Sequence, residues 1–443
     1  MTTTVELLQQ LIRNQCVNDG TVGSGHEHRS VRTLLDFFGV DGEIFEPAPG
    51  RQSLVYRIPG TQSGSPSLAL VPHLDVVPVS SKGWSADPFA ADIADGFVWG
   101  RGAIDMLNVT AAMAQVFKPY LTGEASMQGD LIFAAVADEE NGGSYGAAPL
   151  VEDHWPLVGA DYLLTEVAYP SLPGPHGRLY PVAVGEKGPF WTRLETTGEP
   201  GHGSAPYRTE NALQPLTAVV DGLSKIADPI QIGEEWREFA AAIDQPPEVI
   251  AALIDPDRVD DATDDIAVTD PTLARYIHAV THMTVSPNLV RGGIKTNVIA
   301  HDAYADVDIR ALPGMDREFV NAHIRRAAAG VADQVSITPI ADHPATVSSK
   351  DNPLWSAVVS GIESQTGSRS VLPTMMTGFT DARFWRAKGT VAYGVGLYDD
   401  ALGFGEFLSL FHGHDERVSV ESVELTTTLL TSILSEFGSR TAD

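Results

Sequence analysis

The sequence predicts an α/β fold, a mostly parallel mixed sheet flanked by helices, with an α+β domain inserted into it. Continuous apolar runs alternate with helix-spaced segments over the first 186 residues, as in parallel sheets that are covered on both faces. The pattern changes to alternating strands from about residue 187 and returns to helix, strand and helix from about residue 353. The chain has 443 residues, whereas a single core rarely exceeds roughly 250–300 residues. We therefore expect one domain made of residues 1–186 and 346–443, with residues 187–345 as the inserted domain.

Composition limits the classes of function. Hydrophobic residues make up 43% of the chain and charged residues 20%, which is enough apolar material for a large core. The formal net charge of -29 argues against binding to nucleic acid or to anionic membranes, since both need concentrated Lys and Arg. The single cysteine, Cys16, excludes an intrachain disulfide. No signal-peptide pattern and no run of about 18 apolar residues is evident, so we expect a cytoplasmic protein.

The first part of the large domain is expected to begin with two helices and to continue with strands. Apolar residues recur at helical spacing over residues 5–13 and 27–38. Strand-like apolar runs cover residues 53–58, 67–71 and 130–137. In sheets of this kind, functional residues gather at the carboxyl ends of the strands.

The inserted domain is expected to contain both strands and helices. The predicted elements are a strand at 190–196, a helix from about 211, strands at 283–290 and 303–309, a helix at 317–330 and a strand at 335–340. The polar, acidic stretch at 233–270 is predicted to be a surface excursion with short helices. A closing helix over residues 420–437 is expected to complete the large domain.

A histidine and an aspartate two residues apart follow the apolar run at residues 68–71. His73 and Asp75 therefore project to the same side of the strand end. One can bind a metal ion while the other supports it, because metal-bound imidazoles usually donate their second nitrogen to a carboxylate or a carbonyl. Taken alone, such a pair is more often structural.

Two further segments deliver acidic side chains to the ends of elements. A glycine-rich turn at residues 99–104 precedes Asp105, which an isolated reading would treat as a helix N-cap. The strand at 130–137 runs directly into Asp138, Glu139 and Glu140. Acidic runs are usually solvated, but at the end of a buried strand their mutual repulsion needs a compensating cation.

Two more segments complete the set. Glu166 ends the apolar strand at residues 162–165, and His412 stands shortly before the closing helix. Each of the five segments is compatible with a structural role. Five such endings within one predicted sheet favour a metal site.

In this order the five segments resemble the dinuclear zinc amidohydrolases that include aminoacylase, acetylornithine deacetylase, succinyl-diaminopimelate desuccinylase, glutamate carboxypeptidase and several dipeptidases. The resemblance spans nearly the whole chain. It implies a zinc-peptidase type of fold with two Zn²⁺ ions per subunit, for which Co²⁺ or Mn²⁺ are possible substitutes. By this resemblance His73 and Glu166 look like ligands on one side of the metal pair, Glu140 and His412 look like ligands on the other, and Asp105 looks like the bridging carboxylate.

The resemblance also assigns catalytic roles. Glu139 resembles the general base, which takes a proton from water and delivers it to the leaving nitrogen. Asp75 resembles the residue that steadies an imidazole ligand. His202, within residues 198–206, resembles a lid histidine that stabilises the oxyanion in the active site of a partner subunit. His202 therefore predicts a homodimer formed through the inserted domain, which would act as a lid.

Three more residues resemble substrate binders of the family. Asn297 lies in the segment 291–299, Arg310 in the segment 308–313 and Gly378 in the loop 377–383. Arg310 is suited to a bidentate grip on a substrate carboxylate. An ion pair within the lid is the structural alternative for Arg310.

The sequence departs from the family pattern at Ala300, Asp415 and Met106, and none of these positions is a predicted ligand or the base. His414 competes with His412 for the ligand role, and the spacing to Glu416 favours His412. The pair His26 and His28 fits no family segment and is interpreted as a surface feature.

We therefore predict a metal-dependent hydrolase that cleaves an amide bond in an N-acyl amino acid or a short peptide with a free carboxylate. Alternatives are a dipeptidase or carboxypeptidase, an N-carbamoyl amino acid hydrolase, a catalytically silent binding or scaffold protein, and a two-metal phosphoesterase. The sequence leaves the acyl group, the amino acid, the native metal and the pathway open.

Overall fold

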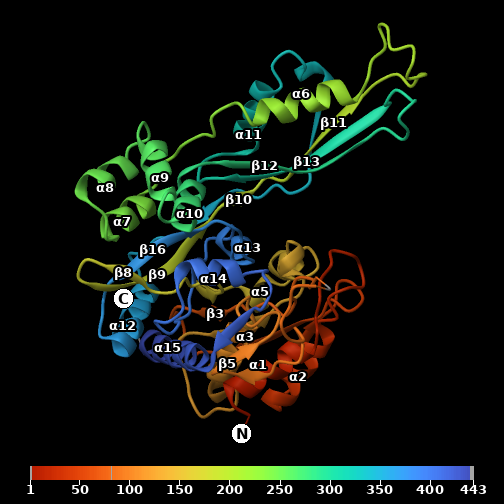
Figure 1. The fold of residues 1–443 in the computed structure, drawn as a ribbon. Coiled ribbons are helices and arrows are strands. Elements are labelled where there is room, and N and C mark those ends of the chain that lie inside the picture. Colours follow the sequence, from red (N-terminus) through yellow and green to blue (C-terminus); the bar gives the residue numbers. More distant parts are fainter. Residues whose placement is uncertain (1, 81, 440–443) are drawn as a thin grey trace.

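The computed structural model describes residues 2–80 and 82–439, and its largest sheet runs in the order β1-β2-β6-β3-β7-β17-β9-β15, with β8 and β16 also paired to β9 (Figure 1). The four central strands β6, β3, β7 and β17 are parallel, and antiparallel pairs lie on both sides of them. The strands are β1 (Glu43–Phe45), β2 (Ser53–Ile58), β3 (Leu68–Leu70), β6 (Leu131–Ala135), β7 (Tyr162–Thr165), β8 (Leu172–Gly174), β9 (Gly177–Glu186), β15 (Thr346–Val347), β16 (Val371–Met376) and β17 (Val391–Gly394). The predicted mixed sheet with a parallel centre is confirmed.

Helices cover both faces of this sheet, because successive side chains of a strand point to opposite sides. Leu68 and Leu70 of β3 belong to one core and Ala69 to the other. The first core includes residues of α1 (Thr4–Arg13), α2 (His28–Phe38), α3 (Leu107–Leu121), α12 (Pro353–Thr366) and α15 (Val420–Gly438). The second includes residues of α4 (Ala147–Asp153), α5 (Trp155–Val158) and α13 (Ala382–Arg386). The first two predicted helices and the closing helix are confirmed to within one residue at each end.

A small three-stranded sheet, in the order β18-β5-β4, flanks the large one. Its strands are β4 (Ile93–Ala94), β5 (Phe97–Trp99) and β18 (Arg417–Ser419). It ties the segment before Asp105 to the segment after His412, two of the five segments that the sequence selects. Across the described residues, the structure contains no helix of the length and apolarity that a membrane span requires.

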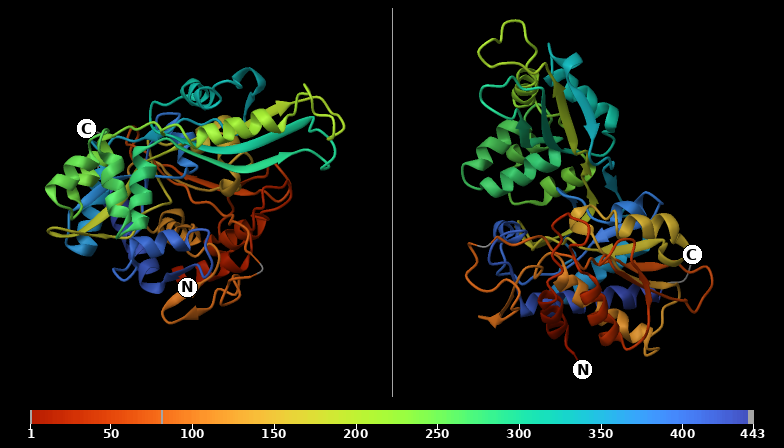
Figure 2. Two further views of the ribbon diagram at one scale, coloured as in Figure 1. Left: turned by 45° about the horizontal axis from the view of Figure 1, so that its top comes forward. Right: turned by 90° about the vertical axis from the view of Figure 1, so that its right-hand side faces the viewer.

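The inserted domain is built on a second, antiparallel sheet in the order β10-β13-β11-β14, with β12 also paired to β13. Its strands are β10 (Gly188–Pro189), β11 (Thr192–Thr197), β12 (Thr284–Gly292), β13 (Asp302–Ala311) and β14 (Ser336–Pro339). Residues of α6 (Leu213–Leu223) and α11 (Arg317–Ala327) share a separate core with it, and a short helix η2 (Ala332–Gln334) precedes β14. Figure 2 shows this lid standing above the large sheet. The chain enters the lid between β9 and β10 and leaves it between β14 and β15.

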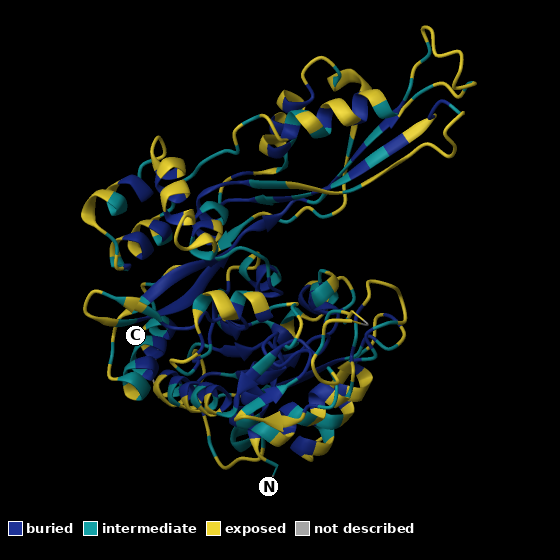
Figure 3. Cartoon of the chain, in the orientation of Figure 1, coloured by how far each residue is buried: buried dark blue, intermediate teal, exposed yellow. Residues whose placement is uncertain are grey.

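The acidic stretch that was expected to be a surface excursion has a second role. Residues 233–270 form α7 (Glu234–Ala242), α8 (Pro247–Leu253) and α9 (Val259–Ala267), and together with the following α10 (Pro271–Thr281) we call them the helical insert. The short helices are confirmed, but Trp236, Phe239 and Ile277 are buried in the same core as the large sheet. Its outer surface is exposed, as Figure 3 shows. The apolar inner face was not predicted, because the stretch is rich in acidic residues.

Candidate active site

The strand ends of the large sheet bring the predicted ligands together. His73 follows β3, Glu139 and Glu140 form part of the short helix η1 (Glu139–Asn141) after β6, and Glu166 follows β7 directly. Because β6, β3 and β7 are parallel neighbours, their carboxyl ends meet at one edge. Asp105 precedes α3, and His412 follows α14 (Phe404–Leu410). We call these six residues the strand-end cluster.

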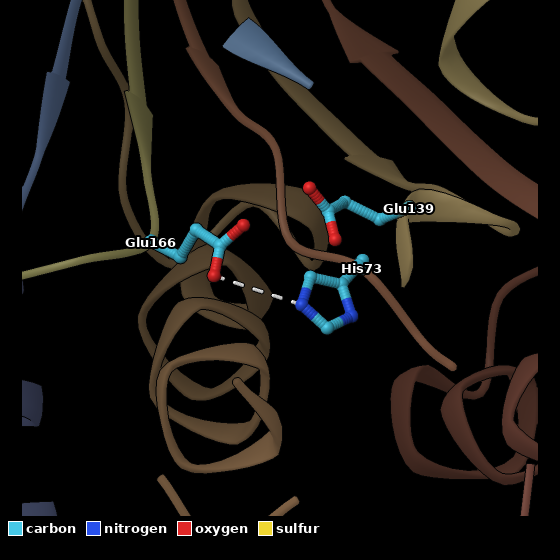
Figure 4. A group of neighbouring side chains, drawn as sticks. All are labelled: His73, Glu139 and Glu166. Atoms are coloured by element: carbon cyan, nitrogen blue, oxygen red, sulfur yellow. Dashed lines mark ion pairs between the residues drawn. The ribbon is translucent and has the colours of Figure 1, made fainter. Parts of the chain in front are cut away.

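Asp105 lies between the two imidazoles of this cluster. One of its oxygens, Oδ1, is 3.3 Å from Nε2 of His73, and the other, Oδ2, is 3.0 Å from Nε2 of His412. His73 Nε2 is also 3.7 Å from Oε2 of Glu166, an approach that Figure 4 shows beside Glu139. On the other side, His412 Nε2 is 3.2 Å from Oε2 of Glu140. Asp105 is thus shared between His73 with Glu166 on one side and His412 with Glu140 on the other, and their roles as metal ligands stay a prediction.

The donor set fits bound metal ions. Ligand atoms of His73, Glu139 and Glu166 lie within 4.8 Å of one another, and so do those of His73, Asp105 and Glu140. Imidazole nitrogens and carboxylate oxygens are suitable ligands for zinc. Within the described residues, Oε1 of Glu140 is buried without a hydrogen-bond partner. A buried carboxylate oxygen of this kind needs a compensating group, which a cation would provide.

The electrostatics of the cluster point in the same direction. Burial, and then the charge of Asp105, raises the pKa of Glu140 to about 7, and burial raises the pKa of Glu166 to about 8. Burial and the nearby Glu166 hold the pKa of Glu139 well above its usual range. Burial lowers the pKa of His412, but hydrogen bonds to Asp105 and Glu140 outweigh it and raise that pKa to about 10. The protein alone thus supplies too little positive charge to keep these carboxylates ionised.

Asp75 supports the cluster in a way that differs in detail from the predicted one. Its backbone oxygen, rather than its carboxylate, accepts from Nδ1 of His73 at 3.0 Å, while the nearer carboxylate oxygen is 3.7 Å away. The carboxylate instead accepts from the backbone N–H groups of Glu139 and Glu140, each at 3.2 Å. Asp75 therefore fixes both the imidazole and the turn that carries the predicted base.

A buried polar network behind Asp75 was not found from the sequence. Asn18 Nδ2 donates to Asp75 at 2.8 Å and to Asp138 at 3.1 Å. Arg51 donates to the Asn18 side-chain oxygen and to Glu27, both at 2.7 Å. Arg51 is only 1% exposed, so it places a positive charge behind the acidic turn. These residues are far apart in the sequence and form no motif, which leaves no signal from which to predict the network.

A second support of the site is an ion pair between Arg101 and Glu416. It could have been predicted, because both residues lie in segments that were singled out from the sequence. Arg101 Nη1 donates to Glu416 Oε2 at 2.6 Å, and Arg101 Nη2 donates to the backbone oxygen of His412 at 3.1 Å. Oε1 of Glu416 accepts from the backbone N–H of Ile104 at 2.7 Å and from that of Asp105 at 3.2 Å. This ion pair holds the Asp105 and His412 segments together.

The competing histidines lie outside the cluster. Nε2 of His414 is 2.7 Å from Oγ of Ser80, and the His414 ring packs edge-on against Trp84. His26 is half-buried and His28 is exposed at the start of α2. Only His412 of the pair 412 and 414 therefore approaches Asp105 and Glu140.

The three departures from the family pattern have separate structural roles. The Met106 sulfur accepts from the backbone N–H of His73 at 3.1 Å. Asp415 accepts from the backbone N–H and the hydroxyl of Ser85, each at 2.7 Å. Ala300 is buried in the core of the lid.

A cavity of about 370 Å³ opens onto the cluster from between the large domain and the lid. Its lining residues are Asp105, Glu139, Glu140, Glu166, Val167, Tyr169, Trp191, Arg310, Met376, Thr377, Gly378, Phe379, Phe407, Leu408, Phe411 and His412. The predicted binders Arg310 and Gly378 are among them. The aromatic residues were not predicted, since an apolar residue near a motif cannot be distinguished from core by its sequence.

Arg310 is already engaged within the lid. Its Nε and Nη2 donate to the two carboxylate oxygens of Asp308 at 2.6 and 3.0 Å, so the ion pair considered as an alternative is present. The guanidinium carbon lies 5.3 Å from the Trp191 ring centroid and 5.1 Å from that of Phe379. Nη1 is buried and has no hydrogen-bond partner among the described residues. Both N–H groups of Nη1 therefore remain for a ligand, and the bidentate grip on a carboxylate stays a prediction.

The other two predicted lid residues lie away from the cavity. His202 and Asn297 are exposed, and neither lines the cavity. Their loops pair with each other, since the Gly203 N–H donates to the Asn297 backbone oxygen at 2.8 Å. We call the loops 198–212 and 293–301 the lid tip. The loop between β11 and α6 forms the yellow-green end of the lid at the upper right of Figure 1, far from the large sheet.

Comparison with known sequences gives a single family. A sequence model of peptidase family M20/M25/M40 matches residues 69–436. The chain is 26% identical to aminoacylase-1 of Homo sapiens over 412 residues, which cover 90% of this chain and 87% of that protein. It is 27% identical to a succinyl-diaminopimelate desuccinylase of Beijerinckia indica subsp. indica over 379 residues, which cover 84% of this chain and 83% of that protein.

Solved structures show the same fold. The M20 family metallo-carboxypeptidase Sso-CP2 from Sulfolobus solfataricus superposes with a TM-score of 0.75 and 16% identity, covering 99% of this chain and 100% of that one. The YXEP protein of Bacillus subtilis, a dinuclear metal binding peptidase of the M20 family, superposes with a TM-score of 0.58 and 15% identity, covering 97% of each chain.

Proposed function

The chain belongs to peptidase family M20/M25/M40 and is a metal-dependent hydrolase of amide or peptide bonds, and from this premise we propose that it cleaves N-acyl amino acids or short peptides with a free carboxylate. The observation that carries this proposal is the occurrence in one cavity of the strand-end cluster and the buried Nη1 donor of Arg310. The strand-end cluster suits hydrolysis of a carbonyl compound. The Arg310 donor suits a carboxylate in the same compound.

We further propose that the bound metal is a pair of zinc ions. His73, Glu166, Glu140 and His412 would hold them, with Asp105 shared between both halves as its two oxygens already are. Bound metal ions would acidify a water molecule and polarise the amide carbonyl. The dinuclear metal binding of the YXEP protein supports two ions over one.

Glu139 is proposed as the general base. It is 7% exposed, and it is held on the turn that the Asp75 carboxylate fixes. It takes a proton from the attacking water and delivers it to the leaving nitrogen. Burial, and then the charge of Glu166, raises the pKa of Glu139 and so favours the protonated form that this second transfer requires.

Arg310 is proposed to bind the substrate carboxylate through Nη1. A buried, charged donor without a partner is costly, so a carboxylate placed there would be stabilised by a charge-assisted hydrogen bond. Because Asp308 accepts from Nε and Nη2, it fixes the guanidinium plane and with it the position of Nη1. Gly378 lines the same cavity, in the loop that follows β16.

We also propose a homodimer in which His202 of one subunit completes the site of the other. His202 lies outside the cavity of its own chain, and the lid tip carries exposed apolar side chains, Tyr207 at 81% and Ile294 at 88% exposure. Within the described residues β12 pairs on one side only, with β13, which leaves an edge that a second lid could cover. The oxyanion that forms during amide hydrolysis would accept a hydrogen bond from that imidazole.

The reaction is tested by amine release from a panel of N-acyl amino acids, dipeptides and N-carbamoyl amino acids. Metal-stripped protein is assayed alone and with Zn²⁺, Co²⁺ or Mn²⁺. Metal-restored cleavage of a panel member with a free carboxylate, and none of its carboxamide analogue, is the expected result. Silence across the panel with metal bound would overturn the proposal and favour a binding protein.

A further inference from the structure

One side of the cavity is an apolar wall that begins beside the strand-end cluster. It consists of Tyr169, Phe407, Leu408 and Phe411, which we call the α14 wall. The ring centroids of Phe407 and Phe411 are 5.3 Å apart, and those of Tyr169 and Phe407 are 6.0 Å apart. Phe411 directly precedes His412, so the wall reaches the predicted metal ligands without an intervening polar residue.

The helical insert supports this wall from behind. The ring of Tyr276, on α10, lies 5.7 Å from that of Tyr169 and 5.4 Å from that of Phe404 on α14. The Tyr276 hydroxyl donates to the backbone oxygen of Met375 at 3.3 Å. Tyr276 is 4% exposed, so these contacts are part of the core. The wall is therefore a fixed surface rather than a loop that could withdraw from a ligand.

The charges around the cavity oppose a second acidic group on the substrate. Of the described residues that line it, only Arg310 and His412 can be positively charged. Nη1 of Arg310 is assigned to the first carboxylate and its guanidinium lies between two aromatic rings, and His412 is held by Asp105 and Glu140. The carboxylates of Asp105, Glu139, Glu140 and Glu166 line the same space, and the proposed zinc ions that offset their charge are taken up by these ligands and by the scissile carbonyl. A second carboxylate would be desolvated there without a partner.

We propose that the α14 wall binds the acyl group of the substrate and that this group is a medium-length alkyl or aromatic chain, not a succinyl group. This inference rests on the proposed function. If the substrate carboxylate binds Arg310 and the scissile carbonyl lies on the strand-end cluster, the acyl chain leaves the carbonyl on the side where Phe411 and His412 meet. Trp191 and Phe379 are occupied by the Arg310 guanidinium, which leaves the α14 wall, with Val167 and Met376, as apolar surface for the chain.

The test is a series of acyl chains on one amino acid at a time. N-acetyl, N-butanoyl, N-hexanoyl and N-succinyl derivatives of leucine, glutamate and lysine are compared by kcat/KM with the zinc-loaded protein. We expect kcat/KM to rise about fourfold for each methylene added between acetyl and hexanoyl, the value for burying one CH₂ group. The succinyl derivatives should be cleaved at least about tenfold more slowly than the butanoyl ones, because their extra carboxylate remains unpaired.

Variants of the wall connect the series to these residues. Leu408 is half-buried, so Leu408→Ala should fold, and it should lower kcat/KM for hexanoyl substrates about tenfold while acetyl substrates change less than about threefold. Leu408→Arg should raise the ratio of succinyl to hexanoyl cleavage. The control is Ser409→Ala, an exposed position on the same helix outside the cavity, which should leave the whole series unchanged.

Binding gives a measurement that does not need turnover. Calorimetry with zinc-loaded Glu139→Gln protein should show N-hexanoyl-leucine binding at least about tenfold more tightly than N-succinyl-leucine. Equal or reversed affinities, or a chain-length series that Leu408→Ala leaves intact, would overturn the inference. Failure of the proposed function is distinct, because no amide of any chain length would then be cleaved while these affinities could still differ.

Discussion

The strand-end cluster and the lid tip differ in how completely a single chain builds them. His73, Asp105 and Glu166 are each at most 5% exposed and contact other members of the cluster, and Asp75 and Glu416 hold the backbone around them. At the lid tip, His202 and Asn297 are exposed, and the nearest bond of the His202 ring is to Ser204, 2.7 Å away and two residues further on. Burial makes an unpaired polar group of the cluster costly, as at Oε1 of Glu140, whereas exposed groups at the tip can bind water. One chain therefore assembles the strand-end cluster by itself, whereas in the proposed dimer the oxyanion side would come from another subunit.

The largest expected effect is on the cluster side. Glu139→Gln removes the proposed base without removing a proposed ligand, so kcat should fall by about 10³-fold or more, while zinc content stays unchanged. Turnover is followed by amine release and metal content by mass spectrometry. Glu152→Gln, on the exposed surface of α4, is the matched control and should keep full activity. A Glu139→Gln protein that retained activity would remove the base assignment.

The second effect tests whether the lid tip acts in a partner subunit. His202→Ala should lower kcat by about 10²- to 10³-fold with metal content and dimer intact. Co-expressed with Glu139→Gln chains, it should regain activity in about a quarter of the sites, because half of the dimers are mixed and each mixed dimer holds one complete site.

Light scattering of the purified protein establishes the oligomeric state independently of activity. Two inactive variants that stay inactive when combined would contradict action between subunits. A monomer with normal turnover would contradict the dimer itself. Either result would mean that the lid tip closes onto the site of its own chain.

A smaller effect is expected at Arg310, which lines the cavity, unlike His202 and Asn297. Arg310→Lys removes Nη1 and should lower kcat/KM by about 10- to 100-fold for substrates with a free carboxylate, since a charged hydrogen bond is lost. The ratio between carboxylate and carboxamide substrates should shrink accordingly. Arg193 offers a matched control, because it donates to both Asp306 oxygens at 2.7 and 2.8 Å and lies over the Tyr304 ring, yet it does not line the cavity. Equal losses in Arg193→Lys would mean that Arg310 acts only through lid stability.

The cluster was predictable from the sequence for a physical reason. Residues directly after buried parallel strands must lie at one edge, so His73, Glu140 and Glu166 could be grouped before the structure was known. Helices α1 and α2 were predictable as well, because their apolar residues recur at helical spacing. His202 and Asn297 carry recognisable motifs, but a motif does not show whether its loop folds back on its own chain.

Other features depended on tertiary contacts that leave no local pattern. The Asp308 partner of Arg310 lies two residues away on the same strand, and only the structure shows that it takes two donors. Arg51 reaches Asp138 and Asn18 across residues that share no motif. The apolar face of the helical insert and the α14 wall are ordinary core positions in sequence, and they gain meaning from the cavity beside them.

The smallest expected effect is on stability, and it again separates cluster from tip. In the metal-free protein the pKa values of Glu140 and Glu166 are raised to about 7 and about 8, so the folded state holds protons that the unfolded state releases above about pH 4.5. The free energy of unfolding should therefore fall as the pH rises from about 5 to about 8.

Zinc at 100 times its dissociation constant should restore about 2.7 kcal/mol, because it binds the folded state and favours the ionised carboxylates. Thermal unfolding of metal-free protein across this pH range, with and without zinc, measures both. The double variant Glu140→Gln, Glu166→Gln should flatten the slope and lose the response to zinc, whereas His202→Ala should keep both. A slope that persists in the double variant would assign the titration to other groups, among them Glu139 and His412 of the same cluster.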